Sequence, residues 1–311
     1  MPNGVYALKF SNNYYKRFIL LAILRNCLIC STLFMSILSF AVNNPTIIEK
    51  SFLTTDHVKL TYLDGGQGDK TLIFIPGWLM PADIFNAQLQ YFSKKYRVLA
   101  LNPRSQGSSD IYLGKDLAQR RTDDIQEFIR HTHSDKFVLI GWSLGVMETL
   151  DYVHKYGQDG LDGLVLVDNS IGEGTPPKVK KAKNKLKAPM TTDKFVKYIK
   201  GFVRAIFKNE PPKEILQTTE KSALRLASQP NQAFRVLSKP FPREYYRDTV
   251  YEIKVPIWYA ITPRYSEQGL IFSEKHPLGT STIYDNAGHA LFVDVADEFN
   301  SDLENFLRND R

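Results

Sequence analysis

The chain has 311 residues, of which 43% are apolar and 23% are charged. These proportions are typical of a soluble globular protein, and they exclude a disordered chain, a collagen and a polytopic membrane protein. The two cysteines, Cys27 and Cys30, leave no further cysteine to complete a structural zinc site.

The net charge of +7 is unevenly distributed. Residues 1–41 carry four basic side chains and no acid, and residues 178–208 carry eleven basic side chains against the single acid Asp193. The rest of the chain is therefore acidic, and the basic balance is no sign of nucleic-acid binding. We interpret the lysine-rich segment as a solvated helix face, with contact to an anionic membrane surface as the alternative.

Residues 1–41 have the organisation of a secretory signal. A basic stretch ends at Arg25, an apolar run of about 14 residues extends from Cys27 to Phe40, and Ala41 ends a small-x-small site. We expect cleavage after Ala41 and an exported protein, periplasmic or secreted, without cysteine. The alternative is a membrane anchor formed by residues 18–42, because the apolar run alone is shorter than a bilayer span.

From Thr46 onward, short apolar runs alternate with helical patterns. This alternation predicts an α/β fold with a largely parallel sheet covered on both faces. The predicted strands are Ile47–Leu53, Val58–Leu63, Thr71–Ile75, Arg97–Leu101, Phe137–Ile140, Leu164–Val167, Ile257–Ile261 and Thr280–Tyr284. The predicted helices between them are Ile84–Phe92, Leu117–His131, Leu144–Tyr156 and Val295–Leu307.

About 90 residues separate the strand that ends at Val167 from the strand that begins at Ile257. An ordinary crossover needs far fewer residues. Three helical patterns fall in this interval, and we predict a helical cap inserted at 173–235, between core segments 42–172 and 236–311. The three patterns are Val179–Leu186, Thr192–Phe207 and Glu214–Ser228.

A G-x-S-x-G motif occupies residues 141–145, between a predicted strand and a predicted helix. In this context the motif forms a tight turn that raises the serine hydroxyl above the sheet edge. Ser143 is therefore the candidate nucleophile.

A serine nucleophile needs a base, and His289 lies directly after the last predicted strand. The carboxyl ends of parallel strands meet at one edge of the sheet, so His289 is expected beside Ser143. We interpret the other histidines as packed or solvated: His57, His131, His133, His154 and His276.

The loop Pro76–Pro81 follows the strand Thr71–Ile75. Gly77 allows a close backbone approach, so we expect the N–H of Trp78 to supply one donor of an oxyanion hole. The second expected donor is the N–H of Leu144, the residue after the nucleophile.

The chain resembles the α/β-hydrolase fold family, in its branch of capped esterases and lipase-like enzymes, over Ile47–Arg311. Besides the serine turn and the Gly288-His289 pair, residues 102–109 match the family's D-x-R-G-x-G-x-S stretch, with departures at Asn102 and Ser105. The resemblance implies a mostly parallel eight-stranded sheet with helices on both faces, an inserted helical cap, and chemistry without a metal or an organic cofactor.

The resemblance leaves the acid of a catalytic triad between two carboxylates. The family most often places it after the seventh strand, but Trp258–Glu267 contains no aspartate. Asp168, directly after the sixth strand, preserves the order Ser, Asp, His and is our first choice. Glu267, expected on a loop after the seventh strand, is the second.

These residues predict a serine hydrolase that cleaves a small-molecule or lipid carboxylic ester through an acyl-enzyme. A thioesterase, an amidase or a peptidase would use the same triad. A non-catalytic binding protein with this fold is the alternative from another class.

Overall fold

The computed structural model describes residues 45–175, 191–235, 237 and 242–308. The predicted signal peptide and the predicted helix Val179–Leu186 lie outside these residues. Within them, none of the helices combines the length and the apolar character needed to cross a bilayer.

Eight strands form one sheet in the order β1-β2-β4-β3-β5-β6-β7-β8. The pairs β1–β2 and β2–β4 are antiparallel, and the remaining pairs are parallel. The sheet is therefore the mostly parallel eight-stranded α/β sheet that the sequence predicts. Its strands are β1 Ile48–Leu53, β2 Lys59–Gly65, β3 Thr71–Ile75, β4 Arg97–Asn102, β5 Phe137–Trp142, β6 Leu161–Val167, β7 Ile257–Ile261 and β8 Gly279–Ile283.

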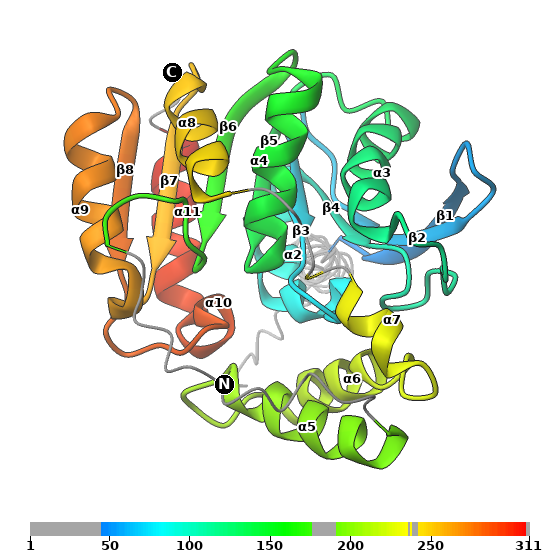
Figure 1. The fold of residues 1–311 in the computed structure, drawn as a ribbon. Coiled ribbons are helices and arrows are strands. Elements are labelled where there is room, and N and C mark those ends of the chain that lie inside the picture. The colour runs from blue at the N-terminus through cyan, green and yellow to red at the C-terminus, as the bar shows by residue number, and fades with distance from the viewer. Residues whose placement is uncertain (1–44, 176–190, 236, 238–241, 309–311) are drawn as a thin grey trace, which may run out of the picture. The chain divides into compact units, whose positions relative to one another are not determined.

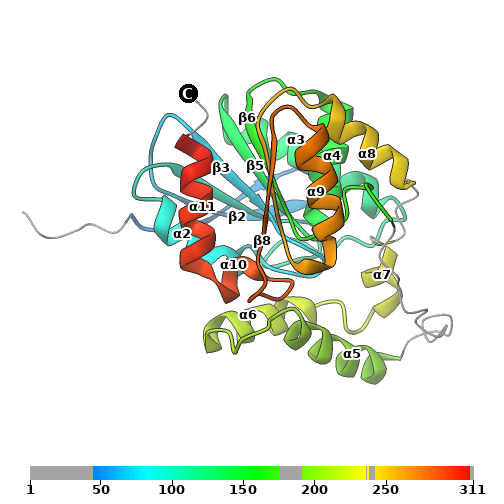
Figure 2. The ribbon, with the colours of Figure 1, turned by 90° about the vertical axis from the view of Figure 1, so that its left-hand side faces the viewer.

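Helices cover both faces of the sheet (Figures 1 and 2). Alternate residues of the central strands enter two apolar clusters: in β3, Phe74 is in the cluster with α2 and α11, whereas Ile73 is in the cluster with α3 and α4. Burial on both faces explains why the central strands are continuous apolar runs. The covering helices are α2 Asn86–Phe92, α3 Leu117–His131, α4 Leu144–Tyr156, α8 Arg243–Glu252, α9 Ser266–Lys275 and α11 Ala296–Arg308.

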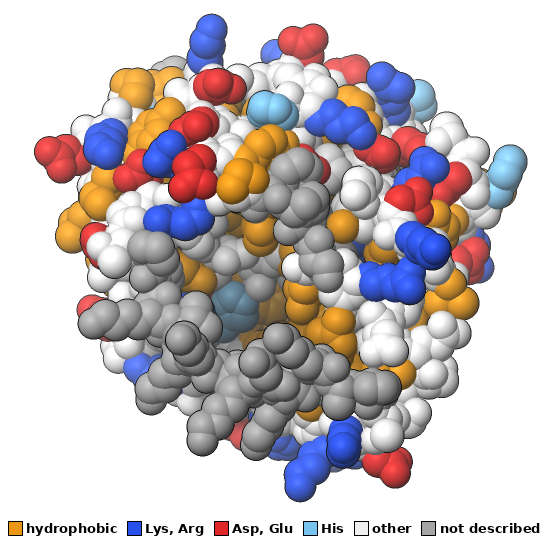
Figure 3. All heavy atoms as spheres, viewed as in Figure 1, with side chains coloured by type: hydrophobic (Ala, Val, Ile, Leu, Met, Phe, Trp, Pro, Cys, Tyr) orange, Lys and Arg blue, Asp and Glu red, His pale blue; other side chains and the backbone are white. Residues whose placement is uncertain are grey.

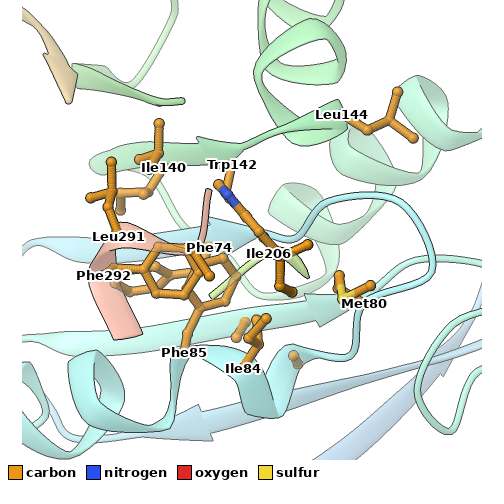
Figure 4. Packing of buried hydrophobic residues seen from close by; sticks show 14 of the residues in the cluster. Phe74, Met80, Ile84, Phe85, Ile140, Trp142, Leu144, Ile206, Leu291 and Phe292 are labelled. Carbon is orange, nitrogen blue, oxygen red and sulfur yellow. The ribbon is translucent and has the colours of Figure 1, made fainter. Parts of the chain in front are cut away.

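Aromatic and aliphatic side chains pack together in the cluster that contains Trp142, the residue before the candidate nucleophile (Figure 4). The ring of Phe85 lies 5.1 Å from that of Phe74 and 4.8 Å from that of Phe292, measured between centroids. Trp142, the last residue of β5, packs edge-on against Phe292 at 5.1 Å. The residue before Ser143 is thus anchored in the core.

Some predicted elements differ from those observed. The predicted helix Ile84–Phe92 is a 3-10 turn, η1 (Ala82–Phe85), followed by α2. The predicted helix Val295–Leu307 is α11, and a short helix that was not predicted, α10 (Leu291–Asp294), precedes it. The expected loop around Glu267 is wrong, because this residue lies in the first turn of α9. The sequence analysis did not predict α8 and α9. Tyr, Arg and Glu make up most of α8, and the apolar residues of α9 form only a weak helical pattern.

Three described helices of the predicted cap lie between β6 and β7 in the chain: α5 Thr192–Ala205, α6 Lys213–Ala223 and α7 Pro230–Arg235. α5 and α6 lie beyond the carboxyl ends of the strands (Figure 1). The inner face of α5 buries Phe195, Ile199 and Val203. Its opposite face is exposed and carries Lys194, Lys197, Lys200 and Arg204.

The loop after β4 is held by a buried ion pair. Arg104 donates to both carboxylate oxygens of Asp124 in α3, through Nε at 2.7 Å and NH2 at 2.5 Å. Both side chains are only 1% exposed. Arg104 also donates two hydrogen bonds to Asp56, which holds the pKa of that carboxyl at about 2. Arg104 therefore joins the loop after β4 to α3 and to the turn that follows β1.

Replacing Arg104 should destabilise the protein strongly. Arg104→Met leaves the Asp124 carboxylate buried without its partner, so we expect the free energy of unfolding to fall by about 3–5 kcal/mol. Urea unfolding followed by circular dichroism measures it. In the double variant Arg104→Met/Asp124→Leu the unpaired charge is gone, and part of the loss should be recovered. An unchanged urea midpoint for Arg104→Met contradicts this account.

The contribution of Asp56 should depend on pH. Its pKa is lowered from 3.8 to about 2 in the folded protein, so its stabilising effect is complete above the unfolded value and is lost as the pH falls through the folded value. The difference in unfolding free energy between the wild type and Asp56→Asn should be constant above pH 4 and shrink between pH 4 and about 2. A difference that is the same at every pH would contradict the assignment.

Candidate active site

Ser143 sits in a sharp turn between β5 and α4, with φ 55° and ψ −119°. Its neighbours must be glycines. A Cβ on Gly145 would lie 2.4 Å from the carbonyl oxygen of Ile75, and a Cβ on Gly141 would lie 2.5 Å from that of Gly145. The glycines therefore let the strand and the helix approach closely enough to raise the serine above the sheet edge.

Three side chains that the sequence singled out meet at this edge. The Oγ of Ser143 lies 2.8 Å from Nε2 of His289, and Nδ1 of His289 lies 2.7 Å from Oδ2 of Asp168. β5 and β6 are neighbours, and β8 is two strands from β6, so the three strand ends converge. The His289 side chain is 28% exposed, whereas Asp168 is almost completely buried. The histidine side chain is thus partly exposed, while the carboxylate that it contacts is buried.

Asp168 is itself held by the end of β7. Its Oδ1 accepts hydrogen bonds from the backbone N–H of Thr262, at 2.8 Å, and from the Thr262 hydroxyl, at 2.7 Å. These donors occupy Oδ1 and leave Oδ2 for His289. Asp168 has φ 46°, a conformation that non-glycine residues rarely adopt.

Glu267, the second candidate for the acid, is bonded elsewhere. Its Oε1 accepts hydrogen bonds from the backbone N–H and the hydroxyl of Thr175, at 3.2 and 3.0 Å. The structure thus places Asp168, and not Glu267, at Nδ1 of His289.

The histidine loop is held against the core and the cap. Trp142 donates through Nε1 to the carbonyl oxygen of His289, at 2.7 Å. Gly288 packs directly on the end of the α5 segment: a Cβ there would lie 2.7 Å from the backbone nitrogen of Lys208. The position of His289 therefore depends both on the core, through Trp142, and on the cap, through the backbone at Lys208.

The candidate oxyanion loop lies against the nucleophile. A Cβ on Gly77 would be 2.9 Å from Cβ and 3.3 Å from Oγ of Ser143, so only glycine fits there. The next peptide group carries the N–H of Trp78. The N–H of Leu144 is at the first position of α4, where a helix offers no intrahelical acceptor. Both predicted donors therefore belong to backbone segments next to Ser143.

The indole of Trp78 joins this loop to the cap. It donates through Nε1 to the carbonyl oxygen of Ala233, at 2.7 Å, and its ring lies 5.3 Å from Phe202 of α5 and 5.1 Å from Phe234 of α7. In the space-filling view, a histidine lies in a hollow on this face, and hydrophobic side chains border part of that hollow (Figure 3). Aromatic rings of the cap therefore pack on the loop that adjoins Ser143.

The other histidines lie outside this site. The ring of His131 stacks on Phe52 at 4.8 Å, and burial lowers its pKa. His276 is buried and lies within 3.2 Å of the Ile253 carbonyl oxygen. Among the residues that the structure describes, no group of three His, Cys, Asp or Glu side chains is arranged to hold a metal ion.

Sequence reasoning missed two residues that hold the site. Thr262 holds Asp168, and Asn169 donates through Nδ2 to the carbonyl oxygen of Ser143, at 2.7 Å. Their positions offered a signal, because each follows a parallel strand whose end faces the same edge. Neither has a motif of its own, so only their neighbours in space reveal their roles.

A model of the alpha/beta hydrolase fold family matches residues 70–254, which is more than half of the chain. Serine hydrolase BPHL of Homo sapiens is 28% identical over 138 residues, which are 40% of this chain and 47% of that protein. The chain thus spans about half the length of the curated relatives it matches.

Solved structures share the fold at low identity. A proposed aryl esterase from Burkholderia cenocepacia has a TM-score of 0.71 at 23% identity, covering 85% of this chain and 99% of that one. A bromoperoxidase from Bacillus anthracis has a TM-score of 0.66 at 18% identity, covering 85% and 99%. At such identities the likeness concerns the fold alone. With the family model matched across the central strands and the serine turn, the chain belongs to the alpha/beta hydrolase fold family.

Proposed function

We propose that this protein hydrolyses a carboxylic ester through an acyl-enzyme formed on Ser143. The observation that carries the proposal is the linear series of contacts from Ser143 Oγ to His289 and from His289 to Asp168, at 2.8 and 2.7 Å. A serine hydroxyl becomes a useful nucleophile when a base accepts its proton and a carboxylate holds that base in the right tautomer.

In the proposed reaction, Ser143 Oγ attacks the ester carbonyl carbon while His289 Nε2 takes the hydroxyl proton. Asp168 stabilises the resulting imidazolium, and the N–H groups of Trp78 and Leu144 bind the oxyanion. His289 then gives the proton to the leaving alkoxide, and the acyl-enzyme remains. A water molecule, deprotonated by His289, attacks the acyl carbonyl. The bond from that carbon to Ser143 Oγ then breaks, His289 returns the proton to Oγ, and the acid is released.

The surroundings favour an ester with an apolar group. Phe202 and Phe234 pack on Trp78, whose backbone adjoins the serine, so an apolar acyl or alcohol part would replace water against aromatic rings. Thioester and amide substrates use the same triad, and the choice among them depends on the leaving group. The esterase named among the similar structures supports an ester as the first substrate to test.

The nucleophile can be tested without knowing the substrate. A fluorophosphonate probe should label Ser143, because an activated serine beside a base attacks it. Ser143→Ala should abolish labelling, and turnover of p-nitrophenyl butyrate should fall by about 10⁶, as for the loss of a triad serine elsewhere. Mass spectrometry of the labelled peptide identifies the residue. Undiminished labelling or turnover in Ser143→Ala would remove the basis of the proposal.

The acid can be tested by paired amide substitutions. In Asp168→Asn, the two Thr262 donors should keep the amide oxygen on their side and turn Nδ2 toward His289, which favours the wrong tautomer. We expect kcat to fall by about 10²–10⁴ with the fold intact. Glu267→Gln is the matched control and should cost less than about tenfold. If Glu267→Gln caused the larger loss of kcat, Asp168 would not be the acid.

A further inference from the structure

One residue of the candidate oxyanion loop has a strained backbone. Leu79 has φ 64°, in the left-handed region that is sterically unfavourable for a non-glycine residue. It is held there at both of its polar groups. Its N–H donates to Oε1 of Gln106 at 2.8 Å, and its carbonyl oxygen accepts from the hydroxyl of Ser222 in α6 at 3.1 Å.

The side-chain amide of Gln106 makes four hydrogen bonds, three of them to this loop, although Gln106 lies on the loop after β4. Besides accepting from Leu79, it donates through Nε2 to the carbonyl oxygens of Gly77, at 3.0 Å, and Met80, at 2.8 Å. Gln106 is buried, with 2% of its surface exposed. Oε1 faces only donors and Nε2 only acceptors, so a single orientation of the amide satisfies all four bonds.

The fourth bond comes from a buried ion pair. Arg121 of α3 donates through NH1 to Oε1 of Gln106, at 2.8 Å, and through Nε and NH2 to Glu148, at 2.6 and 3.0 Å. The side chains of Arg121 and Glu148 are 2% and 1% exposed. Glu148 belongs to α4, the helix that begins at Leu144. Charged hydrogen bonds therefore link the Gln106 amide to the nucleophile helix.

The bond to Gly77 bears directly on the oxyanion hole. The carbonyl of Gly77 and the N–H of Trp78 belong to one planar trans peptide group, so they point in opposite directions. A hydrogen bond that fixes the carbonyl on one side fixes the direction of the N–H on the other. Gln106 thus bonds the carbonyl side of the peptide group whose N–H the proposed mechanism uses.

We propose that Gln106 is a positioning residue for catalysis: it orients the Trp78 N–H toward the oxyanion, and the Arg121–Glu148 pair keeps its own amide in the required orientation. The proposal rests on the proposed function. An N–H that is held in advance costs no reorganisation when charge develops on the carbonyl oxygen, and this is why its alignment affects the transition state more than the bound substrate.

The experiment compares Gln106→Met, which removes all four bonds at similar volume, with Gln106→Glu. The Glu side chain keeps an acceptor for Leu79 and Arg121 but sets a second carboxylate oxygen against the carbonyls of Gly77 and Met80. If Gln106 only satisfied Arg121 and filled space, Glu would preserve the rate. If Gln106 is a positioning residue, the Glu side chain does not preserve the rate. We expect kcat for p-nitrophenyl butyrate to fall about 10- to 100-fold in both variants, with KM nearly unchanged.

The second readout is the rate constant for phosphonylation of Ser143 by the fluorophosphonate probe, which also develops charge on an oxygen and should fall in parallel with kcat. The matched control is Gln88→Met. Gln88 is equally buried and donates through Nε2 to two acceptors, the Phe292 carbonyl and Asn300, neither of them in the oxyanion loop. It should lose comparable thermal stability but keep kcat and the labelling rate.

Two results would overturn the inference: a wild-type rate in Gln106→Glu, or a loss in Gln106→Met no larger than in Gln88→Met. Wild-type protein that neither reacts with the probe nor hydrolyses the ester would instead contradict the proposed function. The two failures are therefore distinguishable.

Discussion

The strained turn at Ser143 is the constraint on which the site depends. A residue with φ 55° is sterically unfavourable unless its surroundings impose the conformation. Here the last strand residue before it, Trp142, is anchored in an aromatic cluster, and the helix after it packs on both β3 and α3. Gly141 and Gly145 remove the Cβ atoms that would keep the strand and helix apart. The core thus stabilises a turn that the local sequence alone would not adopt.

The same device recurs at two other places on this edge of the sheet. Asp168 and Leu79 also have positive φ, at 46° and 64°. In each case, hydrogen bonds from neighbouring segments offset the local strain: the end of β7 bonds Asp168, and Gln106 bonds Leu79. A strained residue held in this way keeps its polar groups in one direction, because a change of its backbone angles would break several hydrogen bonds together. The rigidity of the site therefore comes from tertiary contacts.

The cap is joined to this rigid edge by polar contacts as well as by aromatic packing. The Ser222 hydroxyl donates to the carbonyl of Leu79 and accepts from the N–H of Gly107. The guanidinium of Arg225 donates at 2.6 Å to the carbonyls of Gly107 and Ser109. The cap segment around these residues is thus bonded to both the oxyanion loop and the loop after β4, so a shift of this segment would disturb the backbone next to the nucleophile.

The sequence by itself determined the class of fold, because apolar runs with a strand's length alternate with helical patterns. It placed the bounds of α3 and α4 correctly, since apolar residues lie at both ends of the buried face of α3 and along that of α4, and the glycine turn marks the start of α4. It also singled out Ser143 and His289, because a G-x-S-x-G turn and a histidine after the last strand are local features. The leader and the basic stretch at 178–190 stay predictions.

Only the tertiary structure decided what lies around these residues. The choice between Asp168 and Glu267 depended on which carboxylate reaches Nδ1 of His289, a contact across 121 residues of chain. Thr262 and Gln106 carry no motif, since a hydrogen bond from one loop to another leaves no periodic pattern in either. Strands and helices are encoded by neighbours in the chain, whereas the orientation of a peptide group in the site is set by side chains that only the fold brings together.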